Sequence, residues 1–335
     1  MADFSVHVPF APVRAEQIAL VGDLVRRADN CRLWIGQMLT IEPHQLLAYC
    51  AGLGFRVPVG TSVTLMPLRH PFEAAVQARS LAQITGHPVV AGYGPGSADF
   101  QRALRGTTYR SPLTAAHEYL TAVRGLLNGN QVELAGEYFQ LNGALLPLSH
   151  PPVDVGLGVL REGMARLAGE IADAAITWLC PPDYLRDVLI PAIREGATKQ
   201  TRPVPRVVSV VHVAPRKPGQ DPVRLALSVC RQHLQAPHYV DMLRRAGIAV
   251  DAADPDSGAR TLVESGVFLT GTMTELIEGL DAYRTAGVDE IVLNLSGVGY
   301  HRGDHVAVRE LECLLTALGT VRHRRRQRGG LQAGS

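Results

Sequence analysis

Three short stretches of the sequence have residue types that suit the binding of a flat ligand or a phosphate group. They are VGTSVTLMPLRHP at 59–71, GYGPG at 92–96 and GLG at 156–158, and each places glycine beside an apolar run. Glycine has no side chain, so a backbone can come close to a ring or a phosphate there. One such stretch is weak evidence, because turns after strands also use glycine. Three of them favour a binding surface if the fold brings them to one edge.

An alternation of strand-like and helix-like segments predicts that arrangement. Apolar and β-branched runs predict eight strands, at 4–9, 31–36, 57–66, 88–94, 153–158, 174–179, 206–214 and 288–295. Helical patterns lie between them, with apolar residues three and four positions apart. Eight such units with short connections predict an α/β protein with a (β/α)8 fold, a TIM barrel. In such barrels the loops at the carboxyl ends of the strands form the site, and the three glycine-bearing stretches fall there.

Two segments interrupt the alternation. VELAGEYFQLNGA at 132–144 alternates apolar and polar residues around Gly-Glu, which predicts a β-hairpin on the barrel's rim. The segment 235–266 is longer than a connection requires, so we expect an inserted helical lid after a helix at 222–246. We predict one domain over residues 1–320 and a disordered tail over 321–335, which contains the basic run RHRRRQRGG.

The composition narrows the class of protein. The formal net charge of +2 is small and spread out, which argues against nucleic acid or a membrane surface as a partner. The five cysteines are widely separated and form no CxxC pair, which disfavours a disulfide framework and a zinc site and favours a reducing compartment. The first residues lack a signal-peptide pattern, and no apolar run is long enough to span a bilayer. We therefore expect a cytoplasmic protein without a metal, and a homodimer is one possible assembly.

The order of the motifs resembles the bacterial-luciferase-like superfamily of flavin and deazaflavin oxidoreductases. The motifs that carry the resemblance are VGTSVTLMPLRHP, EAAVQARSLAQITG, PVVAGYGPG, ELAGEYFQLNGA and PPVDVGLGVLREGMARLAGEIADAAITWL. They follow one another along nearly the whole chain, with 235–266 as the least typical part. The resemblance is greatest to the branch that uses coenzyme F420, which implies F420 as the cofactor and FMN as the alternative.

The resemblance also implies where the cofactor lies. In relatives a Gly-Thr-Ser-Val strand makes a non-proline cis peptide whose bulge backs the ring, which would be Ser62-Val63 here. The alternative is that Thr61 and Ser62 only satisfy backbone groups inside the barrel. The phosphate arm would use backbone N–H groups, because Trp178 and Pro181 stand where a close deazaflavin relative has a hydroxyl and a lysine. The expected cofactor-binding residues are Thr61, Ser62, Val63, Gly94, Gly96, Gly156, Leu157, Gly158, Trp178, Leu179 and Cys180.

The acid–base residues of some relatives are absent. Sugar-phosphate dehydrogenases of this family have a histidine at the end of strand two and a carboxylate after strand four, where this chain has Gln37 and Ser97. Neither side chain is an acid or a base near neutral pH, so alcohol oxidation by a histidine base is not expected. A polarising amide and a hydride-bearing ring suit reduction of an activated C=C or C=N bond. We assign Gln37 to catalysis, with a hydrogen bond to the edge of the ring as the alternative role.

The proton donor and the substrate stay open at this point. Tyr93, His7, Glu42, His44 and solvent are candidate donors, and we place Tyr93 and His70 on the substrate side, although His70 also suits a helix start. Relatives in Arg- and Ala-rich sequences often tailor natural products, and some reduce dehydroamino acids in modified peptides. The resemblance therefore implies a small-molecule or modified-peptide substrate. An FMN-dependent monooxygenase and a non-catalytic flavin-binding or assembly paralogue are the alternative functions.

Overall fold

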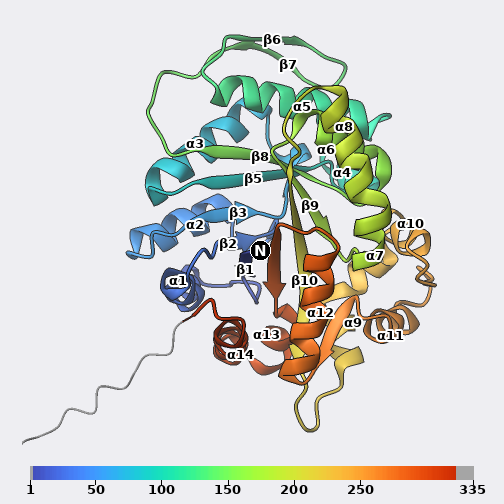
Figure 1. Cartoon of the computed structure of the whole chain (residues 1–335). Helices are drawn as coiled ribbons and strands as arrows, with labels where there is room; N and C mark the ends of the chain where they lie inside the picture. Colours follow the sequence, from blue (N-terminus) through green and yellow to red (C-terminus); the bar gives the residue numbers. More distant parts are fainter. Residues whose placement is uncertain (1–2, 322–335) are drawn as a thin grey trace, which may run out of the picture.

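The computed structural model describes residues 3–321, and its main sheet is a closed parallel barrel (Figure 1). The barrel strands are β1 (Asp3–His7), β2 (Leu33–Ile35), β3 (Val59–Thr61), β5 (Val89–Gly94), β8 (Val153–Gly158), β9 (Ala174–Trp178), β10 (Arg206–Pro215) and β12 (Glu290–Asn294). Strand β10 pairs with both β9 and β12, and β12 pairs with β1, which closes the ring. The predicted TIM barrel is confirmed. The basic run of the predicted tail lies outside the described residues.

Helices between the strands cover the outside of the barrel (Figure 1). They are α1 (Ile18–Arg27), α2 (Pro43–Gly52), α3 (Pro71–Thr85), α5 (Pro112–Leu127), α6 (Glu162–Ile171), α8 (Ile190–Lys199), α9 (Pro222–Gln235), α12 (Met273–Thr285) and α14 (Asp304–Ala317). Several begin with proline, which lacks the N–H that a first turn leaves unpaired. Thr272 and Glu275 form the reciprocal cap of α12. Shorter elements are 3-10 turns at Ala15–Gln17 and Met66–Leu68, β4 (Thr64–Leu65), α4 (Ala98–Arg105), α7 (Pro182–Tyr184), a π-helical turn at Leu185–Leu189 and α13 (Ser296–Arg302).

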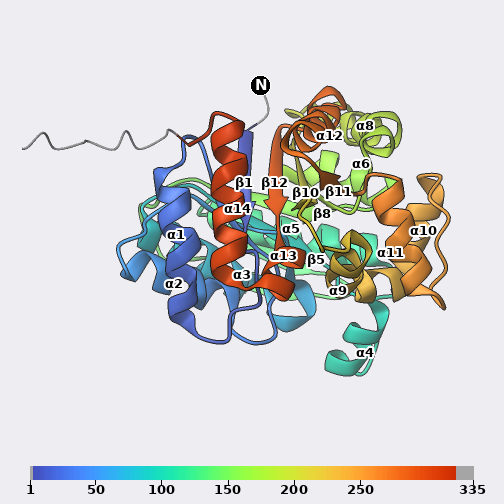
Figure 2. The same ribbon diagram turned by 90° about the horizontal axis from the view of Figure 1, so that it is seen from below.

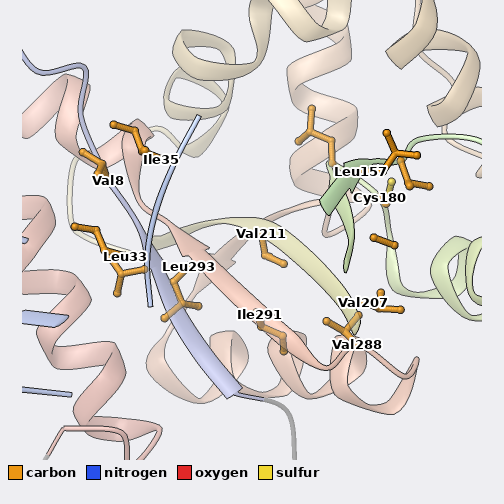
Figure 3. Close-up of a cluster of buried hydrophobic side chains, with 14 of the residues drawn as sticks. Val8, Leu33, Ile35, Leu157, Cys180, Val207, Val211, Val288, Ile291 and Leu293 are labelled. Atoms are coloured by element: carbon orange, nitrogen blue, oxygen red, sulfur yellow. The ribbon is translucent and has the colours of Figure 1, made fainter. Parts of the chain in front are cut away.

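Alternation along each strand divides the core into two layers. Outward side chains such as Val8, Leu33 and Leu293 pack in the layer between strands and helices (Figure 3). Inward side chains fill the lumen, where Trp34, Val90, Ile176, Val208, Val210 and Val292 form a separate cluster. The parity of a residue within its strand therefore decides whether it faces the lumen or the helices.

A buried carboxylate closes the amino end of the barrel. Glu290 is 1% exposed and accepts hydrogen bonds from Ser5 Oγ at 2.6 Å and Trp34 Nε1 at 2.7 Å. Its second oxygen accepts from Arg206 at 3.0 Å. A paired and hydrogen-bonded carboxylate is the form in which a buried charge is tolerated. Because this end is filled, the opposite mouth, at the carboxyl ends of the strands, is the place for a ligand.

The predicted rim hairpin is present as β6 (Val132–Ala135) and β7 (Gln140–Gly143), which pair antiparallel. The Glu118 carboxylate on α5 accepts hydrogen bonds from the backbone N–H groups of residues 137, 138 and 139 in its turn. The hairpin also contacts the start of α3, since His70 Nε2 lies 3.1 Å from the Gln140 carbonyl oxygen. These contacts hold the hairpin beside the first turns of two barrel helices, at the rim of the mouth.

The insertion differs in detail from its prediction. The helix expected over 222–246 is two helices, α9 and α10 (Pro237–Arg245), because Ala236 is extended and Pro237 has no N–H to continue the first helix. Next come α11 (Pro255–Glu264) and the unpredicted strand β11 (Phe268–Gly271), which pairs with the end of β10. Figure 2 shows α10 and α11 beside α9 on one side of the barrel. Across residues 3–321, we find no helix long and apolar enough to cross a membrane.

Candidate active site

Strand parity brings two contrasting surfaces to the carboxyl mouth of the barrel. The first, the glycine face, consists of Ser62, Val63, Gly94 and Gly158, from the ends of β3, β5 and β8. The second, the imidazole face, consists of His7, Trp178 and His212, from β1, β9 and β10. Four steps around the closed barrel separate β3 from β10, and four separate β8 from β1. Those steps place His212 across the mouth from the bulge and His7 across from Gly158, whereas Trp178 on β9 is next to β8, so the two faces meet at that edge.

The glycine face is built around a bulge after β3. The Ser62-Val63 peptide is cis, as the resemblance implied. The Val63 side chain lies against two glycines, since a Cβ built on Gly94 would be 2.8 Å from Val63 Cγ2 and one on Gly158 would be 3.4 Å from Val63 Cγ1. Ser62 Oγ is buried, and no described residue hydrogen-bonds to it. A surface of backbone and one small apolar side chain, with a free hydroxyl, fits a flat polar ring.

Thr61 has a structural role instead of the expected cofactor contact. Its Oγ1 accepts a hydrogen bond from the Gly92 N–H at 2.8 Å and lies 3.0 Å from the Gly92 carbonyl oxygen, to which it donates. Thr64 Oγ1 donates to the same carbonyl at 3.1 Å. The two hydroxyls thus join β3 to β5 where the bulge interrupts the regular pairing. The alternative interpretation holds for Thr61, whereas Ser62 keeps a free hydroxyl.

Two of the residues expected at the phosphate arm lie too deep in the sheet. Gly156 pairs with Gly92 on one side and Ala174 on the other, and the next residue, Leu157, is likewise paired on both sides. Backbone groups between two neighbouring strands serve the ladder and are not free for a ligand. A Cβ on Gly156 would lie 2.8 Å from Ile176 Cδ1, so this glycine makes room for lumen packing. We therefore keep Gly158 but withdraw Gly156 and Leu157 as expected phosphate contacts.

The loops after β8 and β9 offer better backbone donors. Helix α6 starts at Glu162, four residues after Gly158, and its cap residue Arg161 makes no side-chain cap hydrogen bond. A helix start with free N–H groups attracts phosphate. After β9, Leu179 is left-handed with φ 57° and leads into Cys180. The Arg161 guanidinium lies 3.2 Å from Asp241 on α10, so the insertion neutralises the cation closest to this loop in sequence.

The imidazole face is a packed group of aromatic rings. Trp178 is edge-on to His7 at a centroid distance of 5.4 Å and to His212 at 5.3 Å. His233 from α9 stacks on Trp178 at 5.6 Å, and Phe268 from β11 stacks on His212 at 5.8 Å. Trp178 was expected among the cofactor-binding residues, and the structure places it at the centre of this face.

Burial keeps these imidazoles neutral at physiological pH. It lowers the pKa of His7 to about 4, against a hydrogen bond to the Val8 carbonyl that acts in the other direction. Burial also lowers the pKa of His212 to about 3, with further contributions from His233 and His7. His7 Nδ1 lies 2.9 Å from the Val8 carbonyl oxygen and donates to it, which leaves Nε2 with a lone pair.

Four buried ring nitrogens of this face have no hydrogen-bond partner within residues 3–321. They are His7 Nε2, Trp178 Nε1 and both ring nitrogens of His212. A buried polar atom without a partner costs about 1–3 kcal/mol, and proteins rarely accumulate such atoms in one place without a ligand or water. The clustering of these atoms makes this face a candidate site for a polar ligand group or for ordered water.

Gln37 lies at the end of β2, between the two faces. Its N–H donates to the Val63 carbonyl at 3.0 Å, which ties it to the bulge. Its side-chain nitrogen donates to the Met38 carbonyl at 2.9 Å, and its side-chain oxygen accepts from Arg69 at 3.3 Å. The amide is thus held in place with one N–H left for a ligand. Arg69, whose side chain is only 6% exposed, also contacts Glu42 at 3.3 Å and is a site residue that the sequence did not reveal.

The comparisons with known proteins agree with the barrel fold. Residues 5–290 match the family model described as luciferase-like monooxygenase. The chain belongs to this family. It is 28% identical over 237 residues to a 5,10-methylenetetrahydromethanopterin reductase of Methanolobus tindarius, covering 70% of this chain and 71% of the relative. It is 30% identical over 153 residues to an F420-dependent glucose-6-phosphate dehydrogenase of Nakamurella multipartita, covering 44% and 45%.

Other relatives of this luciferase-like chain include a monooxygenase and solved structures. A 4-hydroxyprotoasukamycin monooxygenase of Streptomyces nodosus subsp. asukaensis is 30% identical over 162 residues, which cover 45% of this chain and 43% of the relative. The coenzyme F420 dependent tetrahydromethanopterin reductase from Methanopyrus kandleri superposes with a TM-score of 0.74 at 19% identity, over 96% of this chain and 98% of that one. An F420-dependent secondary alcohol dehydrogenase gives 0.71 at 17%, over 95% and 99%. At these identities the solved structures establish the fold alone.

Tyr93 and His70 do not face the mouth of this luciferase-like barrel as we expected. Tyr93 has outward parity, and its hydroxyl donates to the Ala74 carbonyl on α3 at 3.2 Å. Burial raises the pKa of this phenol well above its usual range, and it packs against the Tyr119 ring. His70 caps α3, with Nδ1 accepting from the Phe72 N–H at 3.2 Å and Nε2 on the hairpin carbonyl described above. Both side chains thus have structural partners, and the helix-start interpretation of His70 is the better one.

The remaining candidates near the mouth are also engaged. Gly96 has φ 71° and serves the turn after β5, and Ser97 caps α4 by accepting from the Phe100 N–H at 3.2 Å. Glu42 accepts from the Gln45 N–H at 2.9 Å at the start of α2, and its other oxygen lies 2.8 Å from His44 Nδ1. Burial would raise the pKa of Glu42, but His44, the Gln45 N–H and Arg69 together hold it below its usual value. Glu42 is therefore ionised and is a poor proton donor.

The sequence contained a signal for His212, which the sequence analysis did not single out. The tripeptide Val-His-Val occurs twice, at 6–8 and at 211–213. In each case both valines face the helices and the histidine faces the lumen. A polar residue between two β-branched ones near the end of a barrel strand is thus a candidate for the mouth. His233 gave no such signal, because it lies on a helix and reaches Trp178 only through the fold.

Proposed function

We propose that this chain is an F420-dependent oxidoreductase that reduces an activated C=C or C=N bond of a small molecule or a modified peptide. The observation that carries the proposal is the mouth itself, which is lined by the glycine face and by an uncharged imidazole face whose His212 lies across from the bulge. The reductase and dehydrogenase relatives, whose names include F420 or a pterin substrate, support the choice of cofactor. Natural-product tailoring is the part of the proposal with the least support, from the 4-hydroxyprotoasukamycin monooxygenase relative.

The glycine face would hold the ring of the cofactor. Ser62 supplies a free hydroxyl, and Val63 backs one side of the ring, because the missing side chains of Gly94 and Gly158 leave room for the Val63 side chain. The start of α6, with Leu179 and Cys180, would hold the phosphate arm through backbone N–H groups. When bound, the reduced deazaflavin supplies a hydride, which is the one chemical capacity that the chain's own side chains lack.

The chain's own residues would position the substrate and exclude charge. The amide of Gln37, fixed by Arg69 and by its backbone contact with the bulge, would offer its remaining N–H to the reacting centre. A neutral donor there polarises a C=O or C=N group without titrating near neutral pH. The imidazole face lines the rest of the mouth, and its tight ring packing limits the entry of water. This chemistry suits hydride addition to an electron-poor double bond.

An FMN-dependent monooxygenase is the second candidate, favoured by the match to the monooxygenase of Streptomyces nodosus subsp. asukaensis. Turnover without oxygen separates the two functions, because a bound reduced deazaflavin does not activate oxygen as reduced FMN does. We expect the purified protein to oxidise reduced F420 in an anaerobic assay with electron-poor alkenes and imines. Turnover that requires FMN and oxygen would favour the monooxygenase, and binding of F420 without turnover would favour a non-catalytic paralogue.

A further inference from the structure

We propose that the imidazole face is a binding site for a neutral amide group of the substrate. This inference deepens the proposed function and rests on it, because it assigns the substrate to the side of the mouth that the ring does not occupy. The face is defined by His7, Trp178 and His212, and none of the roles described so far uses their free ring nitrogens.

The location of the face makes it the substrate side. His212 on β10 lies across the barrel from the Ser62-Val63 bulge, and His7 on β1 lies across from Gly158. A ring held on the glycine face would therefore turn its free side toward the imidazoles. A Cβ on Gly36 would lie 3.8 Å from His7 Nε2 and 3.4 Å from the Ser62 carbonyl oxygen, so His7 Nε2 borders the edge of the glycine face. The glycine at the end of β2 thus leaves space next to that nitrogen.

The free atoms have a specific hydrogen-bonding pattern. His7 Nε2 is an acceptor, because Nδ1 carries the proton and donates it to the Val8 carbonyl. Trp178 Nε1 is a donor. A neutral His212 offers one donor and one acceptor, both without partners among the described residues. A primary or secondary amide, with its C=O acceptor and N–H donor, satisfies both kinds of atom at once, whereas an ester or a ketone satisfies only the donors.

The face selects against charged groups. Its three side chains carry no charge at neutral pH, because burial keeps both imidazoles unprotonated. A carboxylate placed against them would lose its hydration without gaining a cation, which is strongly unfavourable in a buried site. It would also meet the lone pair of His7 Nε2. A phosphate group is excluded for the same two reasons.

The rings are held in place before any ligand arrives. Trp178 contacts both imidazoles edge-on, and His212 is nearly parallel to Phe268, with an interplanar angle of 16°. His7 is fixed by its hydrogen bond to the strand backbone. Preorganised donors and acceptors bind a matching group without first losing side-chain entropy. A rigid face of this kind discriminates between ligands by hydrogen-bonding pattern rather than by adapting to them.

The test compares three ligands that share one double bond and one ring: cinnamamide, methyl cinnamate and cinnamate. Each is titrated into protein loaded with oxidised F420, which cannot transfer hydride, and binding is followed by calorimetry. We expect the amide to bind at least about tenfold more tightly than the acid, with the ester in between. In His212→Phe and His7→Leu we expect the preference for the amide over the acid to fall to about threefold or less. His212→Asn, which keeps a donor and an acceptor, should recover part of it.

His301→Phe is the matched control, because it makes the same chemical change on the exposed face of α13 and should keep the wild-type preference. Thermal unfolding of each variant identifies any that do not fold, and the folded variants of the face then decide. The inference is overturned if the acid binds as tightly as the amide, if the preference survives in the folded face variants, or if none of the three ligands binds. F420 binding and hydride transfer are measured separately, so a failure of this inference is distinguishable from a failure of the proposed function.

Discussion

Lowering the pH should destabilise the protein through its buried histidines. The native fold holds the pKa of His7 at about 4 and that of His212 at about 3, whereas both would titrate near 6.5 in the unfolded chain. Below pH 6.5 the unfolded chain therefore binds more protons than the native one, so the free energy of unfolding falls as the pH falls. This contribution to stability is complete above pH 6.5 and is lost progressively toward pH 4.

The size of the effect follows from the width of that pH range. For each histidine that stays neutral in the native fold, the free energy of unfolding falls by about 1.4 kcal/mol per pH unit once that histidine is protonated in the unfolded chain. Between pH 7.5 and pH 5.0 this amounts to about 2 kcal/mol for each of the two histidines, because about 1.5 of those pH units lie below 6.5. Replacing one of them with an apolar residue should remove its share of the pH dependence, whatever the variant does to stability at pH 7.5.

Urea unfolding at pH 7.5 and pH 5.0 measures this difference for the wild type, His212→Phe and the exposed control His301→Phe. Other groups also contribute to the loss of unfolding free energy that the wild type shows on acidification. The informative quantity is therefore the loss in the wild type minus the loss in the variant. We expect His212→Phe to lose about 2 kcal/mol less than the wild type on acidification, and the control to lose as much as the wild type. If His212→Phe and the wild type lose the same free energy, His212 is not held neutral in the native mouth, and our account of the imidazole face is wrong.

Three substitutions test the other assignments. Gln37→Ala should lower the rate at saturating cofactor more than it lowers cofactor affinity, and steady-state kinetics with a binding titration would reject this role if only affinity fell. Gly158→Val should weaken F420 binding by roughly 2 kcal/mol beyond any change in apo stability. Gly158→Ala is the control and should bind F420 normally, because its Cβ would meet Val63 at an ordinary 3.4 Å. Normal F420 binding by the valine variant would remove Gly158 from the site. Thr61→Val should lower the free energy of unfolding, measured in urea, by about 1–3 kcal/mol, because it leaves the buried Gly92 N–H unpaired. Cofactor affinity should not change. A loss of affinity in a variant of normal stability would restore Thr61 as a cofactor contact.

The barrel was predictable from the sequence because its signals are local. Each strand is a short β-branched run, each helix has apolar residues at three and four spacing, and several helices start at proline. The break between α9 and α10 was also readable in principle, since Pro237 interrupts an otherwise continuous helical pattern. The strand β11 was not, because four residues that pair only with the end of β10 have no pattern of their own.

The site was less predictable because two of its determinants are not local. One is parity at the strand ends: Tyr93 and Gly94 are adjacent in sequence, but one faces α3 and the other faces the mouth. The other is the pairing of a strand with neighbours on both sides. It occupies the backbone groups of Gly156, whereas Gly158 lies at the end of the strand. The imidazole face needs three strands to be placed around the barrel before its members meet. The repeated Val-His-Val tripeptide becomes informative only after that placement is known.

The central claim, that the glycine face binds a deazaflavin, is tested most directly by a fluorescence titration of the purified protein with F420, FMN and FAD under the same conditions. We predict that F420 binds with a dissociation constant on the order of micromolar or lower, and that FMN binds at least about tenfold more weakly, a difference of about 1.4 kcal/mol. Equal affinity for F420 and FMN, or tight binding of FMN alone, would contradict the account.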